Sequence, residues 1–590
     1  MSILRKILTC PLFVLAMFLA STNVFALQTP DTEYEAVAEE FIKGYFAARP
    51  LLGTSMGLHE YDGKITDYSR LALDAETFRL KKFDDRLQKF ELNKLSQRQS
   101  IDLRILQAGI RKEVFQREVM QIYERNPIVY ARAADVNVYI KRNFSPLDDR
   151  VHSIIAIESQ IPNIMIAAKT NLDPVLPKPY VELAIKIAKA SAEFLRKDLV
   201  EAIADLKDER QRSEFLESNR KAASALTDYA VWLERERLPK ATADFALGEE
   251  KFRRMLRETE LIDLPSQRLL EIGIARLEKE QRAFAEAAQQ IDPSKSAPEV
   301  FKQIQAEHPT SESLLADINK NLENIRKFVV TRKLVTIPSE VRARVKETPQ
   351  YRRATSFASM DTPGAFEKRS TEAYYYVTPP ESDWPPVQRD EWLTAFNFYT
   401  ADVVSIHEVY PGHYVQFLRL NASSATKVEK IFGSYAFTEG WAHYCEKLMI
   451  DEGYGTVANP NEEDLKRAAK YRMAQSDEAM LRLCRLCVAI KMHTQNMTVD
   501  EASKFFQENC YYEEKPAHAE ALRGTFDPGY MNYTLGKLEI LKLRDDYKAQ
   551  EGENFSAQKF HNELLNHGMP PIRLLREIML KDKSKWDDVL

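Results

Sequence analysis

Three residues with metal chemistry lie close together in the stretch S-I-H-E-V-Y-P-G-H-Y, which covers residues 405–414. Neutral imidazoles, here those of His407 and His413, are good ligands for Zn²⁺. A glutamate beside the first histidine, here Glu408, can take a proton from a water that the metal has acidified, without binding the metal itself. The stretch therefore predicts a hydrolytic metal site with two histidine ligands and a glutamate as general base.

The spacing of the two histidines differs by two residues from the H-E-x-x-H signature of zinc proteases. On a straight helix, residues six apart lie about 240° apart around the axis and share no face. Pro411 disfavours helix at Tyr410, and Gly412 accepts unusual backbone dihedrals. We expect a break here that brings His413 back beside His407. The alternative is that these histidines are ordinary core or surface residues.

A third ligand is expected from residues 438–446, T-E-G-W-A-H-Y-C-E. Glu439, His443 and Glu446 follow one another at intervals of four and three residues, so they share one face of a helix. A carboxylate from a second helix commonly completes a catalytic zinc site with two histidines, and we assign Glu439 to this role. His443 and Glu446 are expected behind the ligands, where they would orient them. A swap, with His443 as the ligand, is the alternative.

The elements that must position these residues are mainly helices. The chain has 590 residues, 44% of them hydrophobic and 29% charged, and only 18 glycines, which excludes collagen-like and disordered classes. The net charge of -5 comes without a basic stripe, so nucleic acid is not expected as a partner. Prolines gather in residues 337–388 around Glu372–Thr378, which is rich in strand-forming residues. We expect a small sheet next to the metal helix, with this segment as an edge strand.

The N-terminus has the features of a secretory signal peptide over residues 1–26. Arg5 and Lys6 precede an apolar run, and Val24-Phe25-Ala26 fits a cleavage site. The run is shorter than the roughly 20 residues that a spanning helix needs. We expect an exported, periplasmic or secreted protein without stable membrane insertion after cleavage; an uncleaved anchor is the alternative.

The mature chain is expected to divide where the prolines begin. Residues 27–336 would form an N-terminal helical region and residues 337–590 a C-terminal region with the metal site. The pair Cys484-x-x-Cys487 lies in an apolar, helix-like stretch, so packing is a better interpretation than redox chemistry. The oligomeric state is left open.

Together these segments resemble a large bacterial family called domain of unknown function 885, which is regarded as related to the gluzincin metallopeptidases. Its H-E-x-x-P-G-H-x-x-Q and E-G-W-A-x-Y-x-E patterns are similar to His407–Gln416 and Glu439–Glu446. The resemblance implies a mainly helical, two-lobed cleft similar to thimet-type oligopeptidases. His443 stands where a residue like leucine is common, so no role for it is implied. Weaker similarities are found in Gly57–Gly63, Ile161–Leu172, Phe526–Lys537 and Phe560–Gly568.

A zinc peptidase also needs a donor for the oxyanion that forms during hydrolysis. In related helical peptidases a tyrosine from the C-terminal region has this role, which makes Tyr533 and Tyr530 candidates. We prefer Tyr533, which matches the family's tyrosine before Gly536-Lys537. His493 is a further candidate for the wall of the cleft, and Arg482, Arg485 and Lys537 are candidates for binding a peptide carboxylate.

The sequence thus predicts an exported, zinc-dependent peptidase that hydrolyses short peptides. The competing hypothesis is a non-catalytic periplasmic peptide-binding or scaffold protein on a degenerate metallopeptidase fold. Hydrolysis of another amide, such as a cell-wall peptide, is a further alternative.

Overall fold

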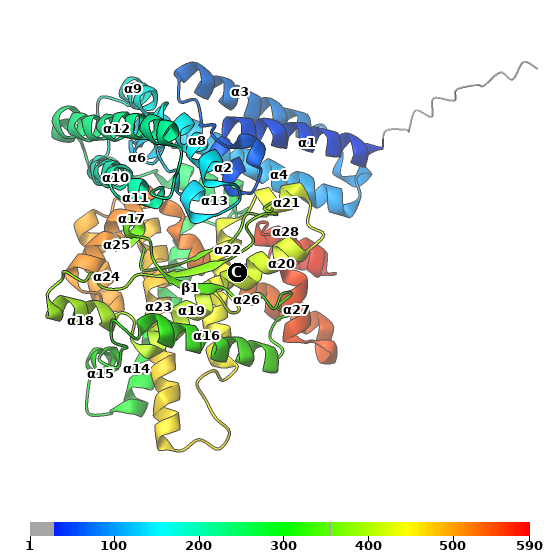
Figure 1. Cartoon of the computed structure of the whole chain (residues 1–590). Helices are drawn as coiled ribbons and strands as arrows, with labels where there is room; N and C mark the ends of the chain where they lie inside the picture. The colour runs from blue at the N-terminus through cyan, green and yellow to red at the C-terminus, as the bar shows by residue number, and fades with distance from the viewer. Residues whose placement is uncertain (1–28, 354–355) are drawn as a thin grey trace, which may run out of the picture.

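Helices make up most of the computed structural model, which describes residues 29–353 and 356–590. The predicted signal peptide lies outside the described residues. The prediction of a mainly helical protein with one small sheet is confirmed. Figure 1 shows the N-terminal helices as an upper layer over a lower body built from the rest of the chain.

The upper layer is formed by helices from the first 240 residues, and their starts follow ordinary capping rules. Ser69, Ser96 and Asp208 each accept a hydrogen bond from a backbone N–H of the helix that follows. The helices are α1 (Pro30–Ala48), α2 (Pro50–Ser55), α3 (Arg70–Leu87), α4 (Gln97–Val114), α5 (Ile122–Arg125), α6 (Ile128–Ala131), α7 (Asn137–Lys141), α8 (Leu147–Glu158), α9 (Ile161–Asn171), α10 (Lys178–Arg196), α11 (Asp198–Ala202) and α12 (Glu209–Trp232).

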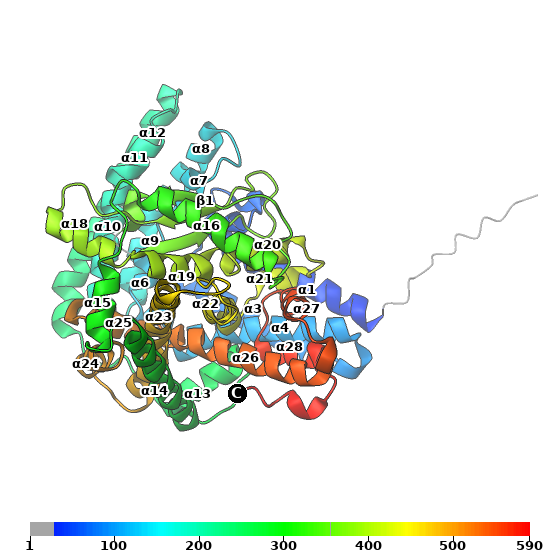
Figure 2. The same cartoon turned by 90° about the horizontal axis from the view of Figure 1, so that it is seen from below.

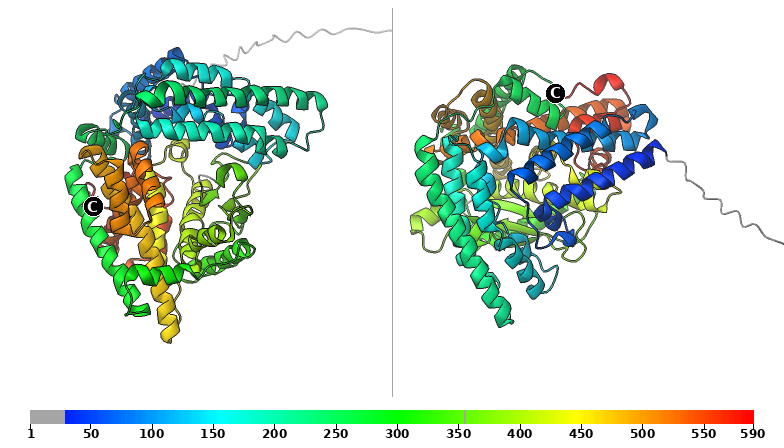
Figure 3. Two further views of the ribbon diagram at one scale, coloured as in Figure 1. Left: turned by 90° about the vertical axis from the view of Figure 1, so that its left-hand side faces the viewer. Right: turned by 90° about the horizontal axis from the view of Figure 1, so that it is seen from above.

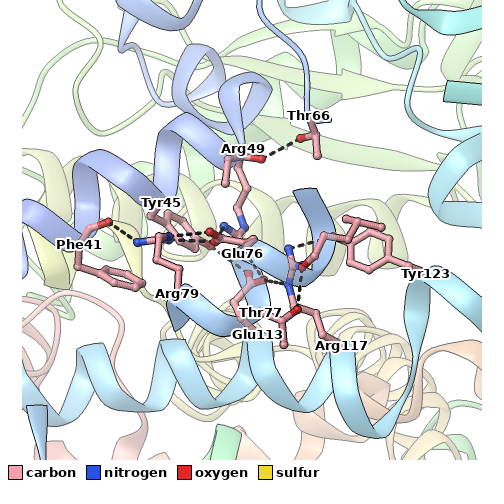
Figure 4. Close-up of polar contacts among 12 residues, drawn as sticks. Phe41, Tyr45, Arg49, Thr66, Glu76, Thr77, Arg79, Glu113, Arg117 and Tyr123 are labelled. Atoms are coloured by element: carbon pink, nitrogen blue, oxygen red, sulfur yellow. Dashed lines mark hydrogen bonds and ion pairs between the residues drawn. The ribbon is translucent and has the colours of Figure 1, made fainter. Parts of the chain in front are cut away.

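An ion-pair network joins α1, α3 and α4 (Figure 4). Arg49, at the end of α1, donates to Glu76 and to Glu113, each at 2.6 Å. Arg79 also binds Glu76 at 2.6 Å, and the hydroxyl of Tyr45 donates to Glu113 at 3.1 Å. The charged groups are largely shielded from solvent, so screening by salt is weak and the network fixes how these helices cross.

The lower body surrounds one long helix, α23, and α14 packs against it extensively. Figure 2 shows this body from below. In Figure 3 (left) the helices α23–α25 stand beneath the upper layer. The helices are α13 (Glu249–Thr259), α14 (Ser266–Ile291), α15 (Ala297–Gln305), α16 (Leu314–Thr331), α17 (Gln350–Arg353), α18 (Pro386–Thr394), α19 (Phe398–Glu408), α20 (His413–Ala422), α21 (Lys427–Ile431), α22 (Tyr435–Asp451), α23 (Glu462–Thr494), α24 (Val499–Cys510), α25 (Glu514–Phe526), α26 (Asn532–Glu551), α27 (Ala557–Leu564) and α28 (Ile572–Met579).

Helix α23 is buried over most of its second half, where α14, α24, α25 and other helices of the lower body pack on it. Its apolar residues share one core with α8–α10, α12 and α14. Cys484 and Cys487 are buried in this core, and burial raises the pKa of the Cys487 thiol to about 12. The predicted division at residue 336 stays a prediction.

The small sheet has the strand order β1-β3-β2, with β1 (Arg344–Glu347) parallel and β2 (Ala358–Asp361) antiparallel to β3 (Tyr374–Val377). The prediction of a strand at Tyr374–Val377 is confirmed, but its prediction as an edge strand is wrong. Both sides of β3 are paired, because the prolines begin only at Pro379, past the end of the ladder. The edge strand that packs against α19 is β2.

One stretch of the described chain, Leu147–Asn171, is long and apolar enough to cross a membrane by length and composition. It forms α8 and α9 of the upper layer, and half of it is buried inside the protein.

Candidate metal centre

The break between the two histidines has a definite shape. Helix α19 ends at Glu408 and α20 begins at His413, and the N–H of Gly412 donates to the carbonyl of Ile406 at 3.0 Å. A Cβ atom on Gly412 would lie only 1.7 Å from the carbonyl oxygen of His407, so no other residue fits here. The chain turns back tightly enough to bring the rings of His407 and His413 to a centroid distance of 4.9 Å.

Helix α22 brings Glu439 to the same point. Its Oε2 atom lies 3.5 Å from Nε2 of His407 and 3.5 Å from Nε2 of His413. A tetrahedral zinc ion with bonds of about 2.0–2.1 Å holds its ligand atoms about 3.4 Å apart. The Glu439 Oε2 atom is buried and has no hydrogen bond within the described chain. Two imidazole nitrogens and one orphaned carboxylate oxygen, all within 4.8 Å of one another, therefore fit a zinc ion.

A second layer of polar contacts holds the first histidine. Nδ1 of His407 lies 2.7 Å from Oε1 of Glu446, whose other oxygen lies 3.0 Å from Nδ1 of His443. Nε2 of His443 lies 3.3 Å from Nζ of Lys537. The side chain of His443 thus contacts Glu446 and Lys537 and is not part of the three-residue cluster, which contains Glu439 instead.

The charges around the centre set its protonation. Burial lowers the pKa of His407, but the carboxylates of Glu439 and Glu446 outweigh it and raise that pKa to about 9. Burial and the Lys537 ammonium lower the pKa of His443 to about 3, so this ring is neutral. Its Nδ1–H then donates to Glu446, and its Nε2 accepts from Lys537. Burial raises the pKa of Glu439, but the facing rings of His413 and His407 outweigh it and hold that pKa below its usual range.

Glu408 is positioned by the edge of the sheet. Its Oε2 atom accepts a hydrogen bond of 2.9 Å from the backbone N–H of Met360 in β2. The backbone of Met360 was not predicted as part of the site, because nothing in the sequence marks a main-chain donor that comes from strand pairing.

Two glycines place Tyr533 beside the candidate metal ligands. Helices α22 and α26 cross where a Cβ on Gly440 would lie 2.5 Å from the carbonyl carbon of Gly536, so their backbones are in direct contact. The ring of Tyr533 then stacks near that of His407, with centroids 6.3 Å apart and planes 18° apart. Burial and the Glu439 carboxylate raise the pKa of Tyr533, so its hydroxyl keeps its proton at neutral pH.

The structure places two other predicted site residues away from the centre. The side chain of Tyr530 is fully buried against Gly524, and its hydroxyl does not line the cavity described below. His493 is also buried: its Nε2 lies 2.8 Å from the carbonyl oxygen of Gly524, and its Nδ1 accepts the N–H of Leu247 at 3.3 Å. Both are held by the core.

A cavity of about 1420 Å³ opens beside the cluster. His407, Glu408 and Tyr533 line it, together with Arg482 and Arg485 of α23. Its other walls come from α15, α18, the edge strand and the α24–α25 connection. Its volume exceeds the roughly 300–1,000 Å³ of a typical small-ligand pocket, so it has room for an extended chain of several residues.

The early G-L-H-E-Y-D-G segment lies at a different place. Nδ1 of His59 lies 3.1 Å from Asp62, and Nε2 lies 3.0 Å from Glu367. The ring stacks on Phe144 at 4.2 Å. This block holds the connection between β2 and β3 against the upper layer and borders a separate cavity of about 770 Å³.

Comparison with known proteins confirms the family resemblance. A family model described as "Bacterial protein of unknown function (DUF885)" matches residues 50–579. One similar solved structure is a "putative lipoprotein of unknown function from Shewanella oneidensis", with a TM-score of 0.77, 22% identity, and coverage of 93% of this chain and 100% of that chain. Another is a "putative lipoprotein from Colwellia psychrerythraea", with a TM-score of 0.76, 17% identity, and coverage of 95% and 99%. Both likenesses show a shared fold. No curated protein matches the chain significantly.

Proposed function

The chain belongs to the DUF885 family of bacterial proteins, and from its candidate metal centre we propose that it is an exported zinc-dependent peptidase. The observation that carries this proposal is the convergence of His407, His413 and Glu439 beside a cavity that also contains Glu408. Two histidines and a carboxylate are the protein ligands of a well-known class of hydrolytic zinc sites, in which a fourth position stays open.

Each residue near the centre has a definite part in this mechanism. Zinc, when held by the three ligands, supplies Lewis acidity that makes a water more acidic and polarises a carbonyl group. Glu408 takes the proton of the attacking water and passes it to the leaving amine, while the Met360 N–H holds one of its oxygens. The Tyr533 hydroxyl donates to the carbonyl oxygen as negative charge develops there. Glu446 fixes the orientation of the His407 ring.

The shape of the cavity supports short peptides as the substrate class. The walls on either side come from α23–α25 and from α18–α19, so an extended chain can lie between them over the metal centre. We propose that this is the two-lobed cleft of a thimet-type oligopeptidase. The description of both structural relatives as putative lipoproteins supports export for this chain.

The decisive experiment compares wild type with Glu408→Gln, both loaded with zinc. Glutamine keeps the shape of the side chain and its contact to Met360 but cannot accept the proton. We expect one zinc per chain in both proteins and cleavage of a short-peptide library, followed by mass spectrometry, only in wild type. Cell-wall peptides in the same assay test the alternative that the enzyme hydrolyses an amide of the cell wall.

Two results would count against the proposal. A fully active Glu408→Gln protein would refute the role of this residue. A zinc-loaded wild type that binds peptides and cleaves none would favour the non-catalytic binding or scaffold protein.

A further inference from the structure

One helix supplies most of the charged wall of the metal cavity. Asp477, Leu481 and Arg485 of α23 follow one another at intervals of four residues, and so do Glu478 and Arg482, so all five face the same side. Some of their charged groups already have an oppositely charged partner within the protein, and others do not.

Every arginine that lines the cavity has a carboxylate partner. The pairs are Arg482 with Glu478, Arg485 with Glu520 at 2.7 Å, and Arg523 with Asp527 at 3.0 Å. Lys537, the other residue considered for a substrate carboxylate, contacts His443. A substrate carboxylate would therefore have to compete with carboxylates of the protein for these cations.

Asp477 is the opposite case. Its carboxylate lines the cavity, and no hydrogen bond or ion pair to it is found among residues 29–353 and 356–590. Burial raises its pKa to about 7, against the opposing charge of Arg482. The side chain is partly shielded from solvent, and a carboxylate without a partner in such a place is stabilised by a cation beside it.

The walls of the cavity as a whole hold more acidic than basic side chains. Its walls hold eight acidic and four basic side chains, an excess of four acidic ones. Within a cleft of low-dielectric walls such an imbalance raises the local concentration of cations. The carboxylates are Asp390, Glu391, Glu408, Glu446, Asp477, Glu478, Glu513 and Glu520, and the cations are Lys302, Arg482, Arg485 and Arg523.

We propose that Asp477 binds an alkylammonium group of the substrate, so that the peptidase selects positively charged peptides. This inference rests on the proposed function. Asp477 precedes Arg482 by five residues, about 7.5 Å along the helix, and Arg482 lies 3.5 Å from Glu446 behind the first metal ligand. An extended peptide covers that length in about two residues. If the bond that is cut lies beside Arg482, which lines the cavity together with His407, the ammonium group, an N-terminal amine or a lysine side chain, binds about two residues from it.

The test uses four versions of one cleaved peptide: with a free or acetylated N-terminus, and with lysine or uncharged norleucine two residues from the cleaved bond. We expect zinc-loaded wild type to show a kcat/KM about 10–100-fold higher for a charged version than for the doubly neutral one. Asp477→Asn should abolish this difference. Asp500→Asn, a matched loss of charge on the exposed surface of α24, should preserve it. The charged peptide whose higher kcat/KM is lost in the Asp477→Asn protein identifies which ammonium group is bound.

Affinities separate this proposal from the proposed function. The same peptides are titrated into zinc-loaded Glu408→Gln protein, with and without Asp477→Asn, so that binding is measured without turnover. Charged peptides that bind about tenfold or more weakly to the Asp477 variant support the subsite even if wild type cleaves nothing. Equal affinities in both proteins, or an equal loss for charged and neutral peptides, would overturn it.

Discussion

Replacing Gly412 with alanine tests whether the tight turn creates the metal centre. The new Cβ would lie 1.7 Å from the carbonyl oxygen of His407, and real Cβ atoms come no closer than about 3.0 Å to such an atom. The backbone on one side must therefore move by about 1.3 Å. Bonds from zinc to imidazole tolerate about 0.2 Å, so His413 can no longer bind in register with His407.

Two effects of this substitution should be measurable. Overpacking of this kind costs about 1–3 kcal/mol in the free energy of unfolding. Because a ligand is lost, the zinc affinity should fall by more than the about 10–100-fold that the loss of a supporting hydrogen bond costs. Competition with a chromogenic chelator gives the affinity, and elemental analysis after dialysis gives the zinc content.

Gly433→Ala is the matched control for this experiment. A Cβ at that position would meet nothing closer than 3.7 Å, so the same chemical change should leave zinc affinity and thermal stability near those of wild type. If Gly412→Ala also retained one zinc per chain with wild-type affinity, the geometric reasoning about the turn would be refuted.

Two further predictions concern protons and the oxyanion. Burial lowers the pKa of His407, but Glu439 and Glu446 raise it to about 9, while zinc binds only the neutral imidazole. Binding of zinc at pH 7 should therefore release about one proton, and the apparent zinc affinity should rise about tenfold per pH unit until about pH 9. Calorimetry in buffers of different ionisation enthalpy measures the number of protons released, and a value of zero would contradict this prediction. Tyr533→Phe should lower kcat by about 10²–10³-fold and leave zinc content and KM nearly unchanged, because the hydroxyl acts mainly in the transition state. A kcat within twofold of wild type would contradict that role.

Much of the fold class followed from the sequence because helices are local structures. Apolar spacing and scarce glycine were enough to predict a mainly helical chain, and the β-forming segment Tyr374–Val377 was enough to predict a strand. The position of that strand in its sheet was not predictable in the same way. It depends on pairing with segments before and after it, and both of those are four-residue strands with little signal of their own.

For the candidate metal centre, too, local features were predictable from the sequence and long-range contacts were not. The types of its donors and the Pro-Gly break are properties of a few neighbouring residues, so the sequence by itself determined that His407 and His413 could meet. Which side chains complete the centre was decided by tertiary structure. The contact of α22 with α26 at Gly440 places Tyr533 near the ligands, and the pairing of β2 brings the Met360 N–H to Glu408. These contacts join segments far apart in the chain, and helical or strand periodicity contains no information about such distances.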